Sequence, residues 1–145
     1  MPRVVAQKIG QDHHGRTVFA PIVTITIQIG PCIATRLAFI DSGADSTIVP
    51  IEFLTACKVD YKGLSGIASG AGAGGSFETR LLPATVKFRE WVICDEIKVA
   101  APGTLPVALL GRSDFFAKFN VRFRWDMSPP VVDVDPLAKT NSPPT

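Results

Sequence analysis

Residues 39–50 carry the feature that most constrains the fold. Apolar Phe39 and Ile40 run directly into the triplet Asp41-Ser42-Gly43. A strand that ends with a carboxylate at a glycine turn holds a half-buried acid in a fixed place, and that burial is costly unless hydrogen bonds compensate. The simpler interpretation is an Asx-type turn, in which Asp41 bonds the backbone amide two residues on. Both interpretations place Asp41 at the end of a strand.

Composition narrows the class of protein. A chain of 145 residues predicts one domain, and with 46% apolar and 19% charged residues it is rich in apolar side chains for its size. Such an excess indicates apolar surface that a partner covers. The net charge of +2 is small and the basic residues are scattered, so we expect no nucleic-acid partner.

Targeting and cysteine patterns point to one compartment. The sequence shows no signal peptide and no stretch long enough to span a bilayer, so we expect no membrane partner and a cytoplasmic location. Cys32, Cys57 and Cys94 are odd in number and widely spaced. We expect them to be buried thiols in a reducing compartment, with neither a disulfide framework nor a zinc site.

Alternating apolar and polar residues predict short strands along most of the chain. The pattern is clearest in 17–29, where Val23, Ile25, Ile27 and Ile29 alternate with polar residues, and Gly30-Pro31 then turns the chain. Further strands are expected at 32–40, 47–49, 77–82, 84–88, 91–99, 107–110 and 121–125.

Helices are predicted to be few and short. Pro50 begins one that runs to Cys57, and Ser113 is expected to cap one from Asp114 to Phe119. The glycine-dense residues 63–76 lie between strand patterns and predict a mobile hairpin. We therefore predict an all-β, barrel-like domain at residues 17–126. A polar segment precedes it at 1–16, and a proline-rich tail, extended or disordered, follows at 127–145.

Three segments, in order and at similar spacing, resemble the retropepsin-like aspartic proteases. Residues 39–49 resemble the catalytic segment of that family, and residues 67–75 resemble its flap tip. Residues 109–116 resemble its apolar strand ending in glycine, followed by a helix. The resemblance covers residues 17–126. It implies a closed β-barrel with a short C-terminal helix, functional as a symmetric homodimer.

The resemblance also implies a reaction. Aspartic proteases need two carboxylates that share one proton and activate one water. This chain carries one Asp-Ser-Gly and no internal repeat. We therefore expect an aspartic endopeptidase whose dyad, Asp41 and its copy, forms across a homodimer. No metal and no other cofactor is required.

Site roles follow from the same resemblance. Asp41, Ser42 and Gly43 are expected to be catalytic, with Ser in place of the commoner Thr. Leu110, Gly111 and Arg112 are expected to support the site, and Arg112 to form an ion pair with Asp45; Asp45 is alternatively a solvated turn acid. The expected contacts to a peptide substrate come from Ala44, Asp45, Ile67, Ala68, Ser69 and Gly70.

Other interpretations of the motifs remain open. Gly70 to Gly75 satisfies the dinucleotide-binding pattern G-x-G-x-x-G, with Glu96 further on, but no helix is readable after it. Asp12, His13 and His14 carry metal-ligand atoms, although neighbours on an extended chain point apart. A catalytically weak or inactive dimer that binds peptides, and a structural barrel with a chance Asp-Ser-Gly, are the competing functions.

Overall fold

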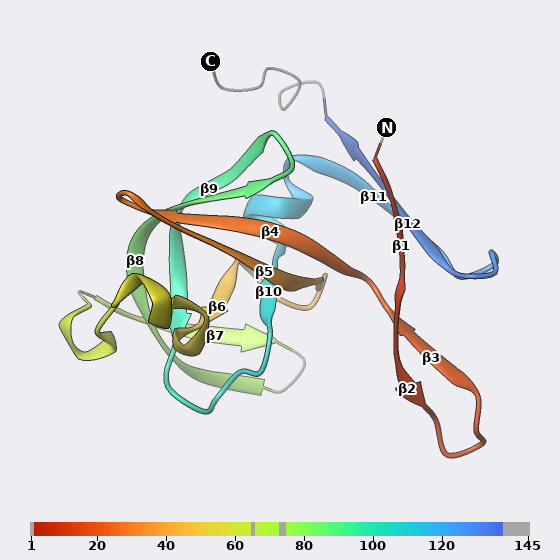
Figure 1. Cartoon of the computed structure of the whole chain (residues 1–145), viewed down its shortest axis with the longest axis horizontal. Coiled ribbons are helices and arrows are strands. Elements are labelled where there is room, and N and C mark those ends of the chain that lie inside the picture. The colour runs from red at the N-terminus through yellow and green to blue at the C-terminus, as the bar shows by residue number, and fades with distance from the viewer. Residues whose placement is uncertain (1, 65, 73–74, 138–145) are drawn as a thin grey trace.

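The computed structural model describes residues 2–64, 66–72 and 75–137, and the side chains of 67–72 and 75–76 lie outside that description. The chain folds as a β-barrel with a smaller terminal sheet and a projecting hairpin (Figure 1). The barrel strands are β4 (Ile22–Ile29), β5 (Cys32–Ile40), β6 (Ile48–Pro50), β8 (Gly75–Phe88), β9 (Trp91–Ala100) and β10 (Ala108–Leu110).

The barrel closes on itself. Its strands pair in the order β4-β5-β10-β6-β9-β8, and β8 pairs again with β4. Alternate residues of β4, namely Val23, Ile25 and Ile27, are buried, as the period of two predicts for a strand with one covered face. Closure removes free strand edges from the sheet. The prediction of an all-β closed barrel is confirmed.

Two barrel strands differ from the predicted bounds. The first predicted strand is interrupted at Pro21, which separates β3 (Thr17–Ala20) from β4. Residues 77–88 form one long strand, β8, whose register shifts between Pro83 and Val86. Proline cannot donate to a ladder of backbone hydrogen bonds, which explains an irregularity at each of these positions.

A hairpin extends beyond the closed barrel at the glycine-rich segment. β7 (Ile67–Gly72) pairs antiparallel with the first part of β8, from Ile67 opposite Arg80 to Gly72 opposite Gly75. The predicted hairpin is therefore confirmed. Residues 73–74 of its tip lie outside the described residues.

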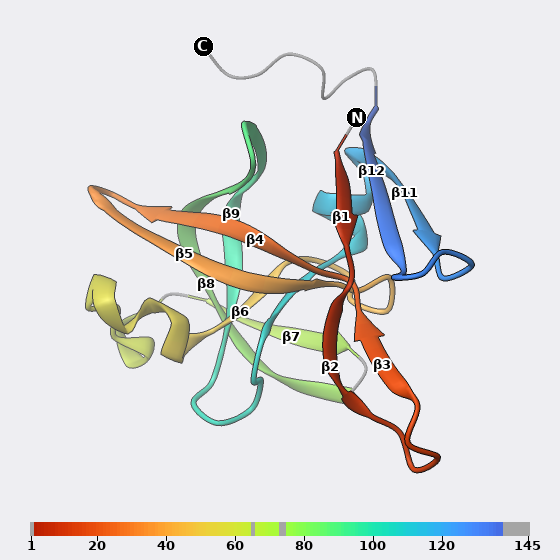
Figure 2. The same cartoon turned by 45° about the vertical axis from the view of Figure 1, so that its right-hand side comes forward.

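The terminal sheet corrects two predictions. β1 (Arg3–Val5), β12 (Val131–Pro136) and β11 (Phe119–Arg124) form a three-stranded sheet with β12 at its centre (Figure 2). Val132 and Val134 are fully buried against the core. The interpretation of 127–145 as an unpacked tail is therefore wrong for 131–136, because these valines bury one face of a central strand. Residues 138–145 lie outside the described part.

Residues 1–16 were predicted only as a polar segment outside the barrel domain, with no strand, and in the structure they contain two strands. β2 (Gln7–Gln11) follows β1 and pairs with β3 to make a hairpin arm that stands away from the barrel (Figure 2). Every residue of β2 is exposed, including the apolar Ile9. At the tip of this arm, the Asp12 carboxylate accepts hydrogen bonds from the backbone N–H groups of His14 and Arg16.

Short helical turns complete the fold: η1 (Ile51–Cys57), η2 (Tyr61–Gly63) and η3 (Arg112–Phe116). The predicted helix ending at Cys57 is confirmed as η1, with Pro50 as its N-cap residue. The second predicted helix is shorter than expected and begins earlier. Gly111, not Ser113, is its N-cap residue, without a capping side chain.

The cysteine prediction is wrong for two of the three residues. Cys32 and Cys57 form a disulfide between the start of β5 and the end of η1, whereas Cys94 is a free thiol. Their Cα atoms lie 5.6 Å apart, within the usual range for a disulfide. This proximity results from the tertiary fold, and a sequence separation of 25 residues does not reveal it. No helix of the described residues is long and apolar enough to cross a membrane.

Candidate active site

Asp41 lies directly after β5, at the first position of a tight loop. Its Oδ1 accepts a hydrogen bond from the backbone N–H of Gly43 at 2.8 Å, and its carbonyl accepts one from Ala44 at 3.2 Å. The Asx-type turn predicted as the simpler interpretation is thus present. It orients one oxygen of the acid, and a turn of this kind is compatible with a catalytic role for the other.

Gly43 leaves space for this arrangement. A Cβ atom at Gly43 would lie 3.1 Å from Oδ1 of Asp41, closer than side chains ordinarily pack. A larger residue at this position would therefore push the Asp41 carboxylate away. Ser42 and Gly43 are both exposed, so the turn is open to solvent or to a second molecule.

The loop that holds Asp41 is bonded to β10 and η3 through its backbone. Asp41 donates its N–H to the carbonyl of Leu110 at 3.0 Å. Arg112 donates its N–H to Ala44 at 3.0 Å, and Ser113 donates to Asp45 at 2.8 Å. Residues 41–45 are therefore fixed to a segment distant in sequence, as a preorganised acid requires.

Gly111 allows the closest approach between these two segments. A Cβ atom at Gly111 would lie 2.5 Å from the backbone nitrogen of Ser46 and 2.6 Å from its Cα. Backbone atoms cannot rotate out of the way, so no side chain fits here. The expectation that Gly111 supports the site has this contact as its physical basis.

Asp114 is a site residue that sequence reasoning missed. It was predicted only as the first residue of a helix, yet its side chain is buried. Its Oδ2 accepts the backbone N–H of Thr47 at 2.9 Å, and its Oδ1 accepts that of Phe115 at 2.8 Å. The sequence signal that could have identified it is an acid directly before the apolar pair Phe115-Phe116, where burial of the carboxylate requires hydrogen-bond partners.

The predicted ion pair between Asp45 and Arg112 is not formed. Lys98 of β9 occupies that role, with Nζ 3.4 Å from both carboxylate oxygens of Asp45. Arg112 is exposed and engages the loop through its backbone N–H. Lys98 approaches because β9 runs parallel to β6, with Lys98 opposite Ile48. A pairing between distant strands of this kind leaves no local sequence signal.

The four expected flap residues, Ile67, Ala68, Ser69 and Gly70, lie in β7 opposite residues 77–80 of β8. Their side chains lie outside the description, so their contact with a substrate stays a prediction. Since Gly75 opens strand β8 and not a helix, the dinucleotide-binding interpretation of these glycines is wrong. Among the described residues, no group of three His, Cys, Asp or Glu side chains gathers as a metal site.

The base of the hairpin is clamped by an aromatic residue. The hydroxyl of Tyr61 donates to Oε1 of Glu78 at 2.9 Å. The guanidinium of Arg80 lies 4.7 Å from the centre of the Tyr61 ring and donates to the carbonyl oxygens of Tyr61 and Lys62. Partial burial, then the hydrogen bond to Glu78, raise the pKa of Tyr61, so the phenol stays a donor.

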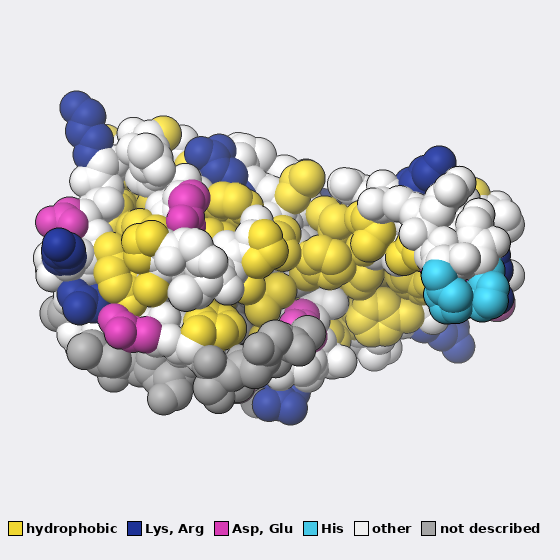
Figure 3. Space-filling view, turned by 90° about the horizontal axis from the view of Figure 1, so that it is seen from below, with side chains coloured by type: hydrophobic (Ala, Val, Ile, Leu, Met, Phe, Trp, Pro, Cys, Tyr) yellow, Lys and Arg dark blue, Asp and Glu magenta, His cyan; other side chains and the backbone are white. Residues whose placement is uncertain are grey.

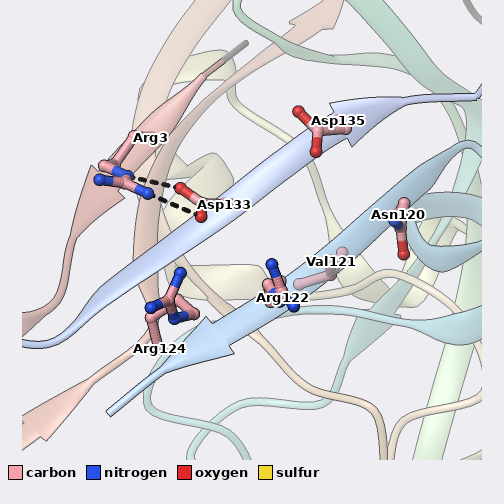
Figure 4. A pocket seen from close by; sticks show the side chains of 7 residues that line it. All are labelled: Arg3, Asn120, Val121, Arg122, Arg124, Asp133 and Asp135. Atoms are coloured by element: carbon pink, nitrogen blue, oxygen red, sulfur yellow. Dashed lines mark hydrogen bonds and ion pairs between the residues drawn. The ribbon is translucent and has the colours of Figure 1, made fainter. Parts of the chain in front are cut away.

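A polar pocket of about 550 Å³ lies on the terminal sheet, lined by side chains of β1, β11 and β12 (Figure 4). None of the residues 41–47 lines it. Asp133 is one of its lining residues and binds Arg3 through both carboxylate oxygens, at 2.6 and 3.0 Å. Arg124 makes two hydrogen bonds to Asp126. The charges of the pocket are thus largely compensated within the chain, and its lining indicates no ligand class.

Comparison with known proteins gives one structural match to report. The chain is similar to the EIAV protease complexed with the inhibitor HBY-793, with a TM-score of 0.49 and 26% sequence identity. The alignment covers 64% of this chain and 82% of that chain. No family model matches the sequence. No curated protein matches it either.

Proposed function

We propose that this protein is an aspartic endopeptidase whose active species is a symmetric homodimer. The observation that carries the proposal is the position of Asp41. It directly follows the half-buried strand β5 in a turn that Gly43 leaves open, on a loop bonded to β10 and η3. A carboxylate held in this way is available for acid–base chemistry on a peptide.

In the proposed reaction, two copies of Asp41 meet on the two-fold axis and share one proton. The ionised copy takes a proton from the attacking water. The protonated copy donates a hydrogen bond to the scissile carbonyl and stabilises the oxygen on which charge develops. Ser42 is proposed to bond across the axis, and the β7–β8 hairpin to cover an extended peptide bound partly by strand-like backbone hydrogen bonds.

The exposed apolar surface supports a partner for this chain. Figure 3 shows hydrophobic side chains across the lower face, from the barrel to the arm that carries the two histidines. Large apolar side chains that are exposed in the described residues are Val5, Ile9, Ile33, Leu37, Phe123, Trp125 and Leu137. Surface of this kind is typical of interfaces, and a second copy is the partner that completes the acid pair.

The test compares wild type with Asp41→Asn, and with Asp95→Asn as a control for loss of an exposed acid. Cleavage of a denatured protein mixture is measured from acidic to neutral pH. A pepstatin-type inhibitor serves as the control for aspartic protease activity. We expect Asp41→Asn to lower cleavage by about 100-fold or more while the dimer stays folded. Analytical ultracentrifugation measures the dimer. Cleavage by Asp41→Asn at the wild-type rate would refute the assignment, and peptide binding without cleavage by wild type would favour a binding module.

A further inference from the structure

The Cys32–Cys57 disulfide lies outside the packed core of the barrel. Both cysteines are partly exposed, at the β4–β5 turn and at the end of η1. Neither belongs to the hydrophobic core cluster, whereas Cys94 packs against it. The barrel closes through the pairing of β4 with β5 and with β8, and the disulfide takes no part in that closure. The bond therefore lies where a solution reductant can reach it, outside the core.

The first two turns of η1 have anchors other than the disulfide. Leu54 is fully buried in the core. Glu52 accepts the backbone N–H of Gly103 through Oε2 at 3.0 Å, and the guanidinium of Arg36 lies 5.9 Å from the centre of the Phe53 ring. At Cys57 the disulfide is the tertiary link that the structure describes. Further along the chain, Val59 and Tyr61 pack against the hydrophobic core. Cleavage of the bond would thus loosen the end of η1, between Leu54 and Val59, and not its start.

The released end leads directly to the β7–β8 hairpin. Only residues 58–60 separate Cys57 from Tyr61. Tyr61 binds Glu78, and Arg80 binds the carbonyl oxygens of Tyr61 and Lys62. Glu78 and Arg80 both belong to β8 and lie opposite Ser69 and Ile67 of β7. The disulfide and the base of the hairpin are therefore joined by one short segment.

We propose that Cys32–Cys57 is a thiol-exchange site that controls the hairpin. In the oxidised protein the disulfide restrains the end of η1 at Cys57, and this limits the motion of the segment up to Tyr61 and, through Tyr61, of the base of the β7–β8 hairpin. Reduction by a dithiol gives this segment slack, so that the hairpin opens more often. The structural effect stands independently of the proposed protease activity, and the consequence for cleavage rests on that activity.

The exchange is chemically balanced with a dithiol as the reductant. One thiolate of the dithiol attacks a sulfur of the pair, which forms a mixed disulfide and releases the other cysteine as a thiolate. The second thiol of the reductant then displaces the remaining cysteine. Two electrons and two protons pass to the protein, leaving the reductant as a cyclic disulfide and the protein with two additional cysteine thiols.

Hydrogen–deuterium exchange on the full chain tests the structural effect. Oxidised wild type is compared with protein treated with dithiothreitol and with Cys32→Ser/Cys57→Ser, and alkylation with mass spectrometry counts the free thiols. We expect exchange in 58–64 and 77–80 to rise about 5-fold or more on reduction, with β4 and β5 staying protected. Cys94→Ser, the matched control, should respond to the reductant as wild type does.

Two results would overturn the proposal: unchanged exchange in both segments after reduction, or loss of protection throughout the barrel. A peptidase assay adds a separate arm. If Asp41-dependent cleavage is present, reduction should change KM for a peptide severalfold in wild type and not in Cys32→Ser/Cys57→Ser. Equal KM values for oxidised and reduced wild type would refute the control of cleavage by the disulfide. Absence of any cleavage would instead refute the proposed function. The hydrogen–deuterium exchange data would still show whether the disulfide restrains the base of the hairpin.

Discussion

Thr47 donates its backbone N–H to Oδ2 of Asp114 at 2.9 Å, across 67 residues of sequence. Both residues are buried, so the bond is shielded from water. Because Thr47 ends the loop that begins at Asp41, this single acceptor holds one side of the site against η3. The loop is thereby positioned by a carboxylate that has no direct contact with Asp41 among the described hydrogen bonds.

Replacement of Asp114 tests that role. Asp114→Ala leaves the N–H of Thr47 buried without an acceptor, whereas the N–H of Phe115 keeps the carbonyl of Gly111. We expect a loss of about 1–3 kcal/mol in the free energy of unfolding. Urea denaturation measures it. Asp95→Ala, which removes an exposed acid, should change that free energy by no more than about 0.5 kcal/mol. Equal effects of the two substitutions would show that the buried bonds contribute nothing.

Gly111 and Gly63 form a matched pair of glycines. In Gly111→Ala the new methyl group would lie 2.5 Å from the backbone of Ser46, whereas at Gly63 the nearest atom is 3.8 Å away. We expect Gly111→Ala to destabilise the protein by about 1–3 kcal/mol and to displace the Asp41 loop, because the obstructing atoms are backbone. Gly63→Ala should be close to neutral in urea denaturation. A neutral Gly111→Ala would contradict the close contact.

Arg3 and Asp133 predict a pH dependence for the terminal sheet. Hydrogen bonds from Arg3 lower the pKa of Asp133 below its ordinary 3.8. The folded-state pKa is the lower one, so the pair stabilises the fold above 3.8, and this contribution is lost as the pH falls through the folded pKa. We expect Arg3→Met to lower Tm at pH 6. The Tm difference between the variant and wild type should shrink below about pH 4, which is the pKa of an aspartate in the unfolded chain.

The control for this experiment is Asp126→Asn. Hydrogen bonds from Arg124 lower the pKa of Asp126 to about 2, but the pair is exposed and water screens it. Its loss should leave Tm nearly unchanged at pH 6. A gap between Arg3→Met and wild type that stays constant down to pH 2 would argue against the Asp133 linkage.

Cys94 is expected to be chemically inert in the folded protein. Burial, with a further contribution from nearby Asp114, raises the pKa of its thiol to about 12. At pH 8 very little thiolate is then present, and the thiolate is the reactive form. Iodoacetamide should modify Cys94 only after unfolding in urea, as mass spectrometry can measure. Rapid modification of the native protein would contradict this burial.

The sequence predicted those parts of the fold that local patterns determine. Alternation in 22–29 and the apolar run at 108–110 correspond to strands, and Asp41 lies at the end of the strand expected to deliver it. Each of these signals is contained within about ten residues. The glycine-rich hairpin was identified for the same reason, since turn residues between two strand patterns have few alternatives.

Relationships between distant segments were not predictable in this way. Lys98 beside Asp45, Asp114 beneath Thr47 and the disulfide of Cys32 all depend on tertiary structure that a single sequence does not encode locally. Strand β12 was missed for a different reason. Its valines stand among prolines and acids, and only the two neighbouring strands make its burial apparent.

The order of the terminal sheet also has a consequence for biosynthesis. Arg3 and its partner Asp133 are 130 positions apart, so the first strand leaves the ribosome long before the central strand that it must join. Until then β1 has no edge on which to pair, and its exposed Val5 stays available to other molecules. Any truncation that removes β12 should therefore leave both β1 and β11 without a pairing strand in this sheet.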